Sequence, residues 1–398
     1  MSHLASTAQP YADHLIEGLR RAGAIQSPAV SDALRIVPRH WFTPTLEPAE
    51  GQRLVVDPDD PSPPLLRTVY ADAPLVVSRD PLAQSPQPRV VARLLAAADL
   101  RPGHRVALLG EQTGWVAALV GQIIGEHGMV RVSQLSPAQA VIIQHALDRM
   151  RHPGMRVVTR ALVDGIVEDA PYHRLLVLRG CGEVAPAWLD QVAPGGALLV
   201  PVFLAWLGVV LRLQRTAIGW SAGLTQVARF PAADGALAPD DIDPLTADNT
   251  PELAELFARP GREAALALPD SAAPDPWGHA ETFALFLATH DPRCVLVQGP
   301  DTEAGALRFG LWDRAGGSLA LYSPEQQMAA AYGESPLALL QLRTHHTAWM
   351  ERGFPGCDAY QVAVDPGDVS GPGEGGWRAD ERGATLPLGA LTLRVTLA

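Results

Sequence analysis

Between residues 105 and 202 the chain alternates short apolar runs with helix-like segments, and this alternation restricts the fold more than any other feature. Short apolar runs are typical of buried strands, whereas the segments between them carry apolar residues at helical spacing. The expected strands are 105–109, 129–133, 156–159, 174–178 and 197–202, and the expected helices are 113–125, 136–150 and 186–193. This order predicts a parallel, doubly wound α/β sheet, which binds ligands beyond the carboxyl ends of its strands.

An N-terminal segment (1–80) is expected to precede a core domain spanning 81–231. Within it, residues 11–42 read as two short helices, because Gly23 ends one apolar-periodic stretch and Pro38 ends the next. A proline-rich loop region follows at 43–79, and a helix is expected at 88–100. Ser136 is the expected N-cap of the helix that it precedes.

The longest apolar run, 197–213, has two interpretations. Pro201 and Arg212 leave it short of the roughly 20 residues that a membrane-spanning helix needs, so two core strands joined by a turn fit better. The first residues carry neither the basic nor the apolar region of an export signal. These features together predict a cytoplasmic protein.

After residue 231 the composition changes, and a second folded unit is expected. Residues 232–275 are rich in Ala, Asp and Pro and read as an acidic linker. Residues 276–398 read as a C-terminal α+β domain. Its expected strands are 293–298, 306–312, 317–322 and a terminal one, its expected helices are 324–332 and 336–350, and its Gly-rich loop is 368–377.

Charge and cysteine content exclude several classes of partner. A net charge of −12 with scattered basic residues argues against a nucleic-acid partner, since phosphate binding needs clustered cations. Cys181, Cys294 and Cys357 are odd in number and far apart, so neither a zinc site nor a disulfide framework is indicated. His345 and His346, with His290, could suggest a metal, but packing or surface roles are more usual, and no metal is expected.

Six collinear stretches resemble the protein-L-isoaspartate O-methyltransferase family. Each falls where the family has a motif: V-P-R-x-x-F, Y-A-D, S-Q-P-x-x-V-A, the glycine loop, G-D-G, and I-P-x-x-L-x-x-Q-L-x-P-G-G-x-L-V-x-P-V. In this chain they are "IVPRHWF" (36–42), "YADAPLVV" (70–77), "QPRVVARLL" (87–95), 101–130, "VDGIV" (163–167) and "APAWLDQVAPGGALLVPV" (185–202). Their order and spacing over about 200 residues make the set far more specific than any one of them.

The resemblance implies a Rossmann-like class I S-adenosylmethionine-dependent methyltransferase fold that esterifies an Asp or isoAsp carboxylate of a peptide. It implies S-adenosylmethionine as cofactor, and Ser85 and Gln87 as candidates for the catalytic position. The implied cofactor-binding residues are Gly110, Glu111, Gln112, Thr113, Gly114, Trp115, Gln134, Asp164 and Gly165. Residues 334–364 also resemble tailoring enzymes of ribosomally made peptide natural products, which makes a precursor peptide the implied partner.

Several positions depart from the family pattern where the cofactor should be held. The middle glycine of the loop is Gln112, and the acid that holds the ribose is Gln134. An amide can bond a hydroxyl, but without the strength that a charge adds. Three further departures are Leu108 for the acid before the loop, Pro86 for the serine before Q-P, and His173 for the Asp before the fourth strand.

These departures leave more than one function open. An active carboxyl methyltransferase is one, and a catalytically inactive relative that binds a peptide or partners an active methyltransferase is another. A third is a different nucleotide or chemistry, because Gln134 and His173 would change the polarity of the pocket. Trp115 is expected to form a pocket wall, and Cys181 is expected to be a small buried residue rather than a nucleophile.

Overall fold

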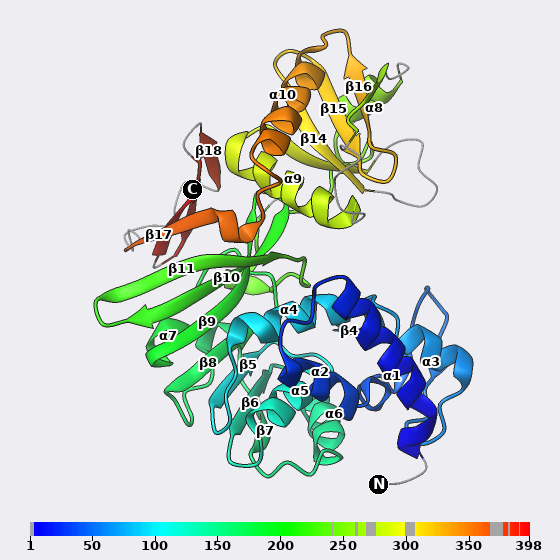
Figure 1. Cartoon of the computed structure of the whole chain (residues 1–398), viewed down its shortest axis with the longest axis vertical. Helices are drawn as coiled ribbons and strands as arrows, with labels where there is room; N and C mark the ends of the chain where they lie inside the picture. The colour runs from blue at the N-terminus through cyan, green and yellow to red at the C-terminus, as the bar shows by residue number, and fades with distance from the viewer. Residues whose placement is uncertain are drawn as a thin grey trace.

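A large twisted sheet and a smaller one organise the chain in the computed structural model. The structure describes residues 4–240, 242–258, 262–267, 276–298, 307–366, 377–380, 383–389 and 391–398. Across these residues an eleven-stranded sheet has the order β18-β19-β20-β17-β11-β10-β9-β8-β5-β6-β7. The five-stranded sheet β12-β16-β15-β14-β13 lies in the upper part of Figure 1, away from the N-terminal helices.

The predicted alternating core is confirmed, and its five strands β7, β6, β5, β8 and β9 are parallel. In chain order the elements are β5 (Arg105–Leu109), α5 (Trp115–Ile124), β6 (Met129–Gln134), α6 (Pro137–Asp148), β7 (Met155–Thr159), η2 (Leu162–Asp164), β8 (Tyr172–Val177), α7 (Pro186–Asp190) and β9 (Val192–Leu204). Both faces of the sheet are covered, since Leu108 packs into one hydrophobic cluster and Leu109 into another. Ser136 caps α6 as expected, accepting the Gln139 N–H at 3.3 Å.

The N-terminal segment is helical and packs against one face of this core (Figure 1). Its elements are α1 (Leu4–Arg21), α2 (Pro28–Ile36), η1 (Arg39–Phe42), β1 (Thr45–Leu46), β2 (Leu54–Val55), α3 (Pro63–Val69), β3 (Leu75–Arg79), β4 (Leu82–Ser85) and α4 (Pro88–Ala98). The two helices expected in 11–42 and the helix expected at 88–100 are therefore present. The 43–79 stretch is less loop-like than expected, because β3 pairs with β4 in a hairpin.

The apolar run 197–213 forms two strands, as predicted. β9 turns back into β10 (Leu207–Thr216), and β10 pairs in turn with β11 (Gly219–Val227), all antiparallel. In the described part of the chain no helix combines the length and apolarity that crossing a bilayer requires.

The C-terminal part is divided differently from the expected linker and domain. The elements are η3 (Gly235–Leu237), α8 (Pro251–Phe257), β12 (Arg262–Ala265), α9 (Pro276–His290), β13 (Cys294–Gln298), β14 (Leu307–Asp313), β15 (Ser318–Ser323), β16 (Met328–Gly333), α10 (Leu337–Glu351), η4 (Cys357–Ala359), β17 (Tyr360–Pro366), β18 (Arg378–Asp380), β19 (Gly383–Leu388) and β20 (Leu391–Leu397). The expected linker, 232–275, supplies β12 to the second sheet. Strands β17, β18, β19 and β20 belong to the first sheet, which they join where β17 pairs with β11. The helix expected at 324–332 is wrong: Met328–Gly333 is a strand. Most of the Gly-rich loop 368–377 lies outside the described residues.

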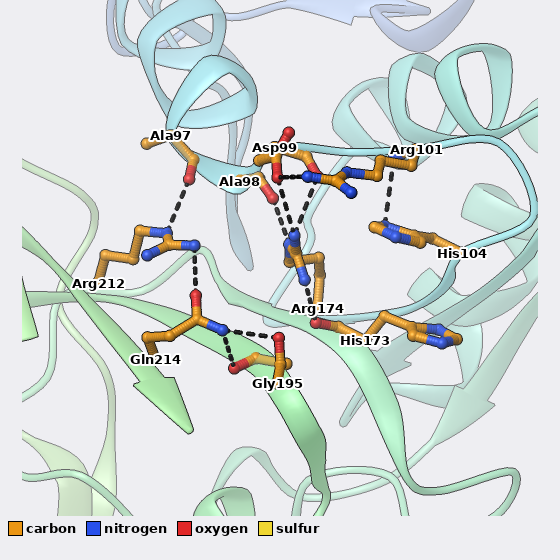
Figure 2. A network of polar contacts seen from close by, with 11 residues as sticks. Ala97, Ala98, Asp99, Arg101, His104, His173, Arg174, Gly195, Arg212 and Gln214 are labelled. Carbon is orange, nitrogen blue, oxygen red and sulfur yellow. Dashed lines mark hydrogen bonds and ion pairs between the residues drawn. The ribbon is translucent and has the colours of Figure 1, made fainter. Parts of the chain in front are cut away.

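A partly buried arginine network closes the carboxyl end of α4 (Figure 2). Arg174 donates to the carbonyl oxygens of Ala98 and Asp99, and Arg212 donates to that of Ala97 at 3.1 Å. The last carbonyls of a helix have no partner within it, so guanidinium groups stabilise them well. The network therefore fixes the end of α4 against β8 and β10.

His173 lies in this network, and this corrects its expected place in the ligand pocket. Its Nδ1 accepts the Arg105 N–H at 3.0 Å, and its ring stacks on His104 with centroids 4.9 Å apart (Figure 2). His173 stands at the amino end of β8, whereas ligands bind at the carboxyl ends of such strands. It cannot set the polarity of that edge.

Candidate functional site

Two adjoining cavities open at the carboxyl edge of the parallel strands. The smaller, of about 470 Å³, passes the ends of β6 and β7, and the larger, of about 910 Å³, passes the end of β8 toward α4 and β11. Both are lined by Pro81, Leu82, Gly110, Gln112, Arg179 and Asp234. The shared lining makes them two parts of one site, whose size is typical of small-molecule pockets.

The glycine loop after β5 forms the floor between the cavities. Gly110 (φ 75°) and Gly114 (φ 89°) adopt left-handed conformations that other residues rarely take. At Gly114 a Cβ atom would lie 3.1 Å from Ile143 and 3.4 Å from Phe42, so glycine also permits close packing of α6 and η1. The backbone conformation thus favours glycine at both predicted positions, and close packing favours it at Gly114 as well.

A buried carboxylate organises the same loop from within. Glu111 is 1% exposed, and its Oε1 accepts the backbone N–H groups of Gln112, Thr113 and Gly114 at 3.0–3.1 Å. Its Oε2 accepts the Ala117 N–H at 3.3 Å. Gly114 and Ala117 are among the donors that the start of α5 leaves unpaired, so Glu111 acts as an internal cap and also pairs the loop amides of Gln112 and Thr113. Thr113 serves the same cap, donating its hydroxyl to Glu111.

Gln112, in place of the family's middle glycine, joins the loop to the β3–β4 hairpin. Its Oε1 accepts the Gln84 N–H and its Nε2 donates to the Leu82 carbonyl, both at 3.1 Å. The amide therefore pairs with the main chain of β4 as a neighbouring strand would. It helps to hold a hairpin that lines both cavities.

We expect Gln112→Gly to release this hairpin while leaving the fold intact. Losing both hydrogen bonds costs about 1–2 kcal/mol locally, because such bonds contribute roughly 1 kcal/mol each. Hydrogen exchange followed by mass spectrometry should show faster exchange of the Gln84 amide. The control is Gln52→Gly, since Gln52 is an exposed loop residue. Unchanged protection at Gln84 would contradict the tether.

Neutral amides and exposed apolar side chains surround the smaller cavity. Gln134 lies at the end of β6, donates to the Glu111 carbonyl at 3.2 Å and accepts the Ser136 N–H at 3.3 Å. Leu135 and Val163 are 68% and 40% exposed on its wall. Large apolar side chains left open in a pocket suit a flat apolar group that would cover them. The cavity is therefore fitted for an aromatic ring with polar substituents.

The two candidates for the catalytic position lie differently. Ser85 is fully buried, and its hydroxyl accepts from Arg39 Nε at 3.3 Å, so it faces the interior. Gln87 lines the larger cavity, and its amide nitrogen donates to the Asp72 carbonyl at 3.0 Å. Of the two, Gln87 is the residue that a ligand in the cavity can contact. Pro86, between them, lines the cavity as well.

Five expected cofactor residues lie away from the lining of both cavities: Thr113, Gly114, Trp115, Asp164 and Gly165. Trp115 is 1% exposed in the core with the Arg39 guanidinium 4.8 Å over its ring, which corrects its expected place as a pocket wall. Asp164 is an exposed residue of η2. Gly165 is buried against Gln191, whose amide bonds the Asp164 carbonyl and the Ile166 N–H at 2.8 Å.

Arg179 and residues 230–234 and 242–243 belong to the site, although the sequence patterns did not predict them there. Arg179 follows β8, and Asp234 and Ile242 come from the stretch expected to be a linker, yet all three line the larger cavity. The Gly180 N–H donates to Pro231 and the Ala233 N–H donates back to Gly180, both at 2.8 Å, so this stretch is bound to the core. The position of Arg179 just after a parallel strand was the available signal.

The remaining candidates lie outside the two cavities. Burial raises the pKa of the Cys181 thiol to about 12, which keeps it protonated and unreactive. His346 packs among Phe283, Tyr322 and Trp349, and burial lowers its pKa to about 4. His345 and His290 lie on neighbouring helices, and in the described chain no group of three potential ligands gathers as a metal site would require.

Comparison with known proteins finds relatives that are similar in sequence and in fold. The sequence profile of the protein-L-isoaspartate(D-aspartate) O-methyltransferases matches residues 56–219. A protein-L-isoaspartate O-methyltransferase of Methanopyrus kandleri is 30% identical over 191 residues, covering 48% of this chain and 76% of that relative. One of Aeropyrum pernix is 27% identical over 219 residues, covering 53% and 75%. A solved protein-L-isoaspartate O-methyltransferase shares the fold at a TM-score of 0.50 and 20% identity, covering 88% of this chain and 95% of its own.

Proposed function

The chain belongs to the protein-L-isoaspartate O-methyltransferase family, and from that premise we propose that it methylates a carboxylate of an aspartyl or isoaspartyl peptide with S-adenosylmethionine. The observation that carries the proposal is the pair of joined cavities at the carboxyl edge of the sheet. One suits a nucleoside, and the other is large enough for the reacting groups. The resemblance of 334–364 to tailoring enzymes makes a ribosomally made precursor peptide the first substrate to test.

The residues present fit the cofactor, with amides in place of a carboxylate. Leu82, Leu135 and Val163 offer open apolar surface for an adenine ring. Gln134 and Gln139 line the same cavity, where amide groups can bond sugar hydroxyls. Gly110 brings the main chain close to the joint between the cavities. When bound, S-adenosylmethionine supplies a methyl group on a sulfonium sulfur for in-line attack by a carboxylate oxygen.

The part of the chain itself in this reaction is to position the substrate and exclude water. Apolar side chains, including Leu178, Val227 and Phe230, line the larger cavity and would strip water from the attacking carboxylate. Gln87 lines the same cavity, and its amide nitrogen is fixed by donating to the main-chain carbonyl of Asp72. The second N–H of this amide can be donated to a substrate oxygen. Positioning of this kind supplies much of the rate enhancement in two-substrate reactions.

Calorimetric titration of the full chain with S-adenosylhomocysteine, followed by mass spectrometry of aspartyl and isoaspartyl peptides incubated with S-adenosylmethionine, tests the proposal. We expect binding at micromolar concentrations and a mass gain of one methyl group that mild base removes, as for an ester. A dissociation constant weaker than about 1 mM, equivalent to roughly −4 kcal/mol, would reject cofactor use.

A catalytically inactive relative that binds a peptide or an active methyltransferase is the second candidate. Two observations support it. Gln112 and Gln134 already bond neighbouring main chain. Among the described residues that line the smaller cavity, Asp234 is the one carboxylate that could hold the ribose of a cofactor. This candidate predicts peptide capture without methyl transfer. Any methyl ester formed by the purified chain excludes it.

A further inference from the structure

Arg179 brings a positive charge to the joint between the two cavities. It lines both of them, together with Gly110 and Gln112 of the glycine loop. Its stem packs on the loop so closely that a Cβ atom on Gly110 would lie 2.5 Å from Arg179 Cγ. This packing fixes the position of the guanidinium where the two cavities meet.

The guanidinium of Arg179 makes only a weak ion pair, because its partner is exposed to water. Arg179 Nη2 contacts Asp234 Oδ2 at 3.0 Å, but the Arg179 side chain is only 16% exposed whereas that of Asp234 is 95% exposed. An ion pair with a fully hydrated carboxylate contributes little net free energy, so a ligand can replace it at small cost. Among the described residues this is the one hydrogen bond that the Arg179 side chain makes, which leaves further N–H donors for a ligand.

The other arginines near this edge are committed to partners outside the joint. Arg229 bonds the Ile242 carbonyl at 3.1 Å and faces Asp243 at 3.8 Å. Arg160 pairs with Glu168. Arg179 alone among these three lines both cavities.

We propose that Arg179 binds the carboxylate of a ligand in this site, and that Asp234 occupies its place until that ligand arrives. The planar guanidinium matches a carboxylate in a two-bond arrangement, and its charge repels a sulfonium cation. The proposal rests on the proposed function for the identity of its ligands. Two ligands of this site would carry a carboxylate: the cofactor, at its amino-acid end, and the peptide, on its acidic side chain.

Binding measurements on the full chain distinguish these two ligands. The probes are S-adenosylhomocysteine, methylthioadenosine (the same nucleoside thioether without the amino-acid part) and a fluorescent aspartyl peptide with its asparaginyl counterpart. If Arg179 binds the cofactor, Arg179→Met weakens S-adenosylhomocysteine about tenfold and leaves methylthioadenosine unchanged. If it binds the peptide, both nucleosides are unchanged and the preference for the aspartyl over the asparaginyl peptide falls about tenfold.

Two further variants complete the experiment. Asp234→Asn, which removes the competing carboxylate, should tighten whichever carboxylate ligand Arg179 binds. Arg21→Met, which removes the same charge from an exposed position of α1 outside both cavities, should alter neither preference. The proposal is overturned if Arg179→Met weakens methylthioadenosine as much as S-adenosylhomocysteine, or leaves every carboxylate preference unchanged. If the wild-type chain binds neither nucleoside, the proposed function fails, while the peptide comparison, made without cofactor, still decides the role of Arg179.

Discussion

Replacing Arg39 by Met should lower the free energy of unfolding by about 4 kcal/mol, because a buried guanidinium with several carbonyl partners is lost. Arg39 is 1% exposed, and its N–H groups reach the carbonyl oxygens of Val69, Ala71, Ala73 and Pro86 at 2.8–3.1 Å. One side chain thus joins the end of α3, the turn after it and the strand-to-helix junction beside the site. Burial lowers its pKa to about 9, so it stays charged at neutral pH.

Urea unfolding followed by circular dichroism measures this effect, and Arg35→Met is the matched control. Arg35 is four residues earlier and pairs with Asp13 and Asp32, with all three side chains well exposed. Its loss should cost no more than about 0.5 kcal/mol. Arg39→Lys should recover only part of the stability, since one ammonium cannot reach every carbonyl that the fork does. Equal shifts for the Arg35 and Arg39 variants would show that the burial of Arg39 contributes nothing.

The parallel core could be predicted because its signals are local. After Arg105, strand β5 is an unbroken apolar run buried on both faces, and α6 begins at a Ser cap, so period, length and capping agree. The segment 324–332 shows the limit of such signals. Its alanines and glutamines favour a helix, yet β16 lies between β15 and β12 and pairs with both. Tertiary pairing outweighed propensity there.

The division of the C-terminal part depends on contacts that no local pattern encodes. β17 reaches the first sheet by pairing Val362 with Ala222, residues far apart in the sequence. Residues 232–243 look like a linker because they are rich in Ala, Asp and Pro, but Asp234 and Ile242 line the larger cavity. The composition of a segment indicates how much entropy it loses when it becomes ordered, but it does not indicate which tertiary contacts compensate for that loss.

At the site, the sequence identified the departures from the family but not their consequences. Gln112 bonds a hairpin some 28 residues earlier, and Gln134 bonds the Glu111 carbonyl 23 residues away. Leu108 is fully buried in a hydrophobic cluster, where a carboxylate would need a partner. Each replacement is thus satisfied within the fold. A single sequence shows only that the family pattern is lost at these positions, whereas the structure shows which contacts Gln112 and Gln134 make instead.

Glu111→Ala should lower the free energy of unfolding by about 3 kcal/mol, because it leaves the N-terminal donors of α5 without an acceptor. The loss falls on a helix whose residues Trp115 to Gly121 are all buried, so water cannot readily replace the carboxylate. Glu111→Gln keeps one acceptor oxygen and removes the charge, and it should cost about half as much, since charge-assisted bonds are roughly twice as strong as neutral ones.

Glu126→Gln is the control at the other end of the same helix, where the glutamate side chain is 77% exposed. It should leave the stability unchanged within about 0.5 kcal/mol. Hydrogen exchange adds a local measure: the amides of Thr113 and Gly114 should lose protection in the Glu111 variants and keep it in the Glu126 variant. Because Glu111 also lines the larger cavity, a loosened loop should weaken S-adenosylhomocysteine as well. If Glu111→Ala unfolds at the same urea concentration as Glu126→Gln, the loop is held by its glycines and side-chain amides, and the buried carboxylate is not its cap.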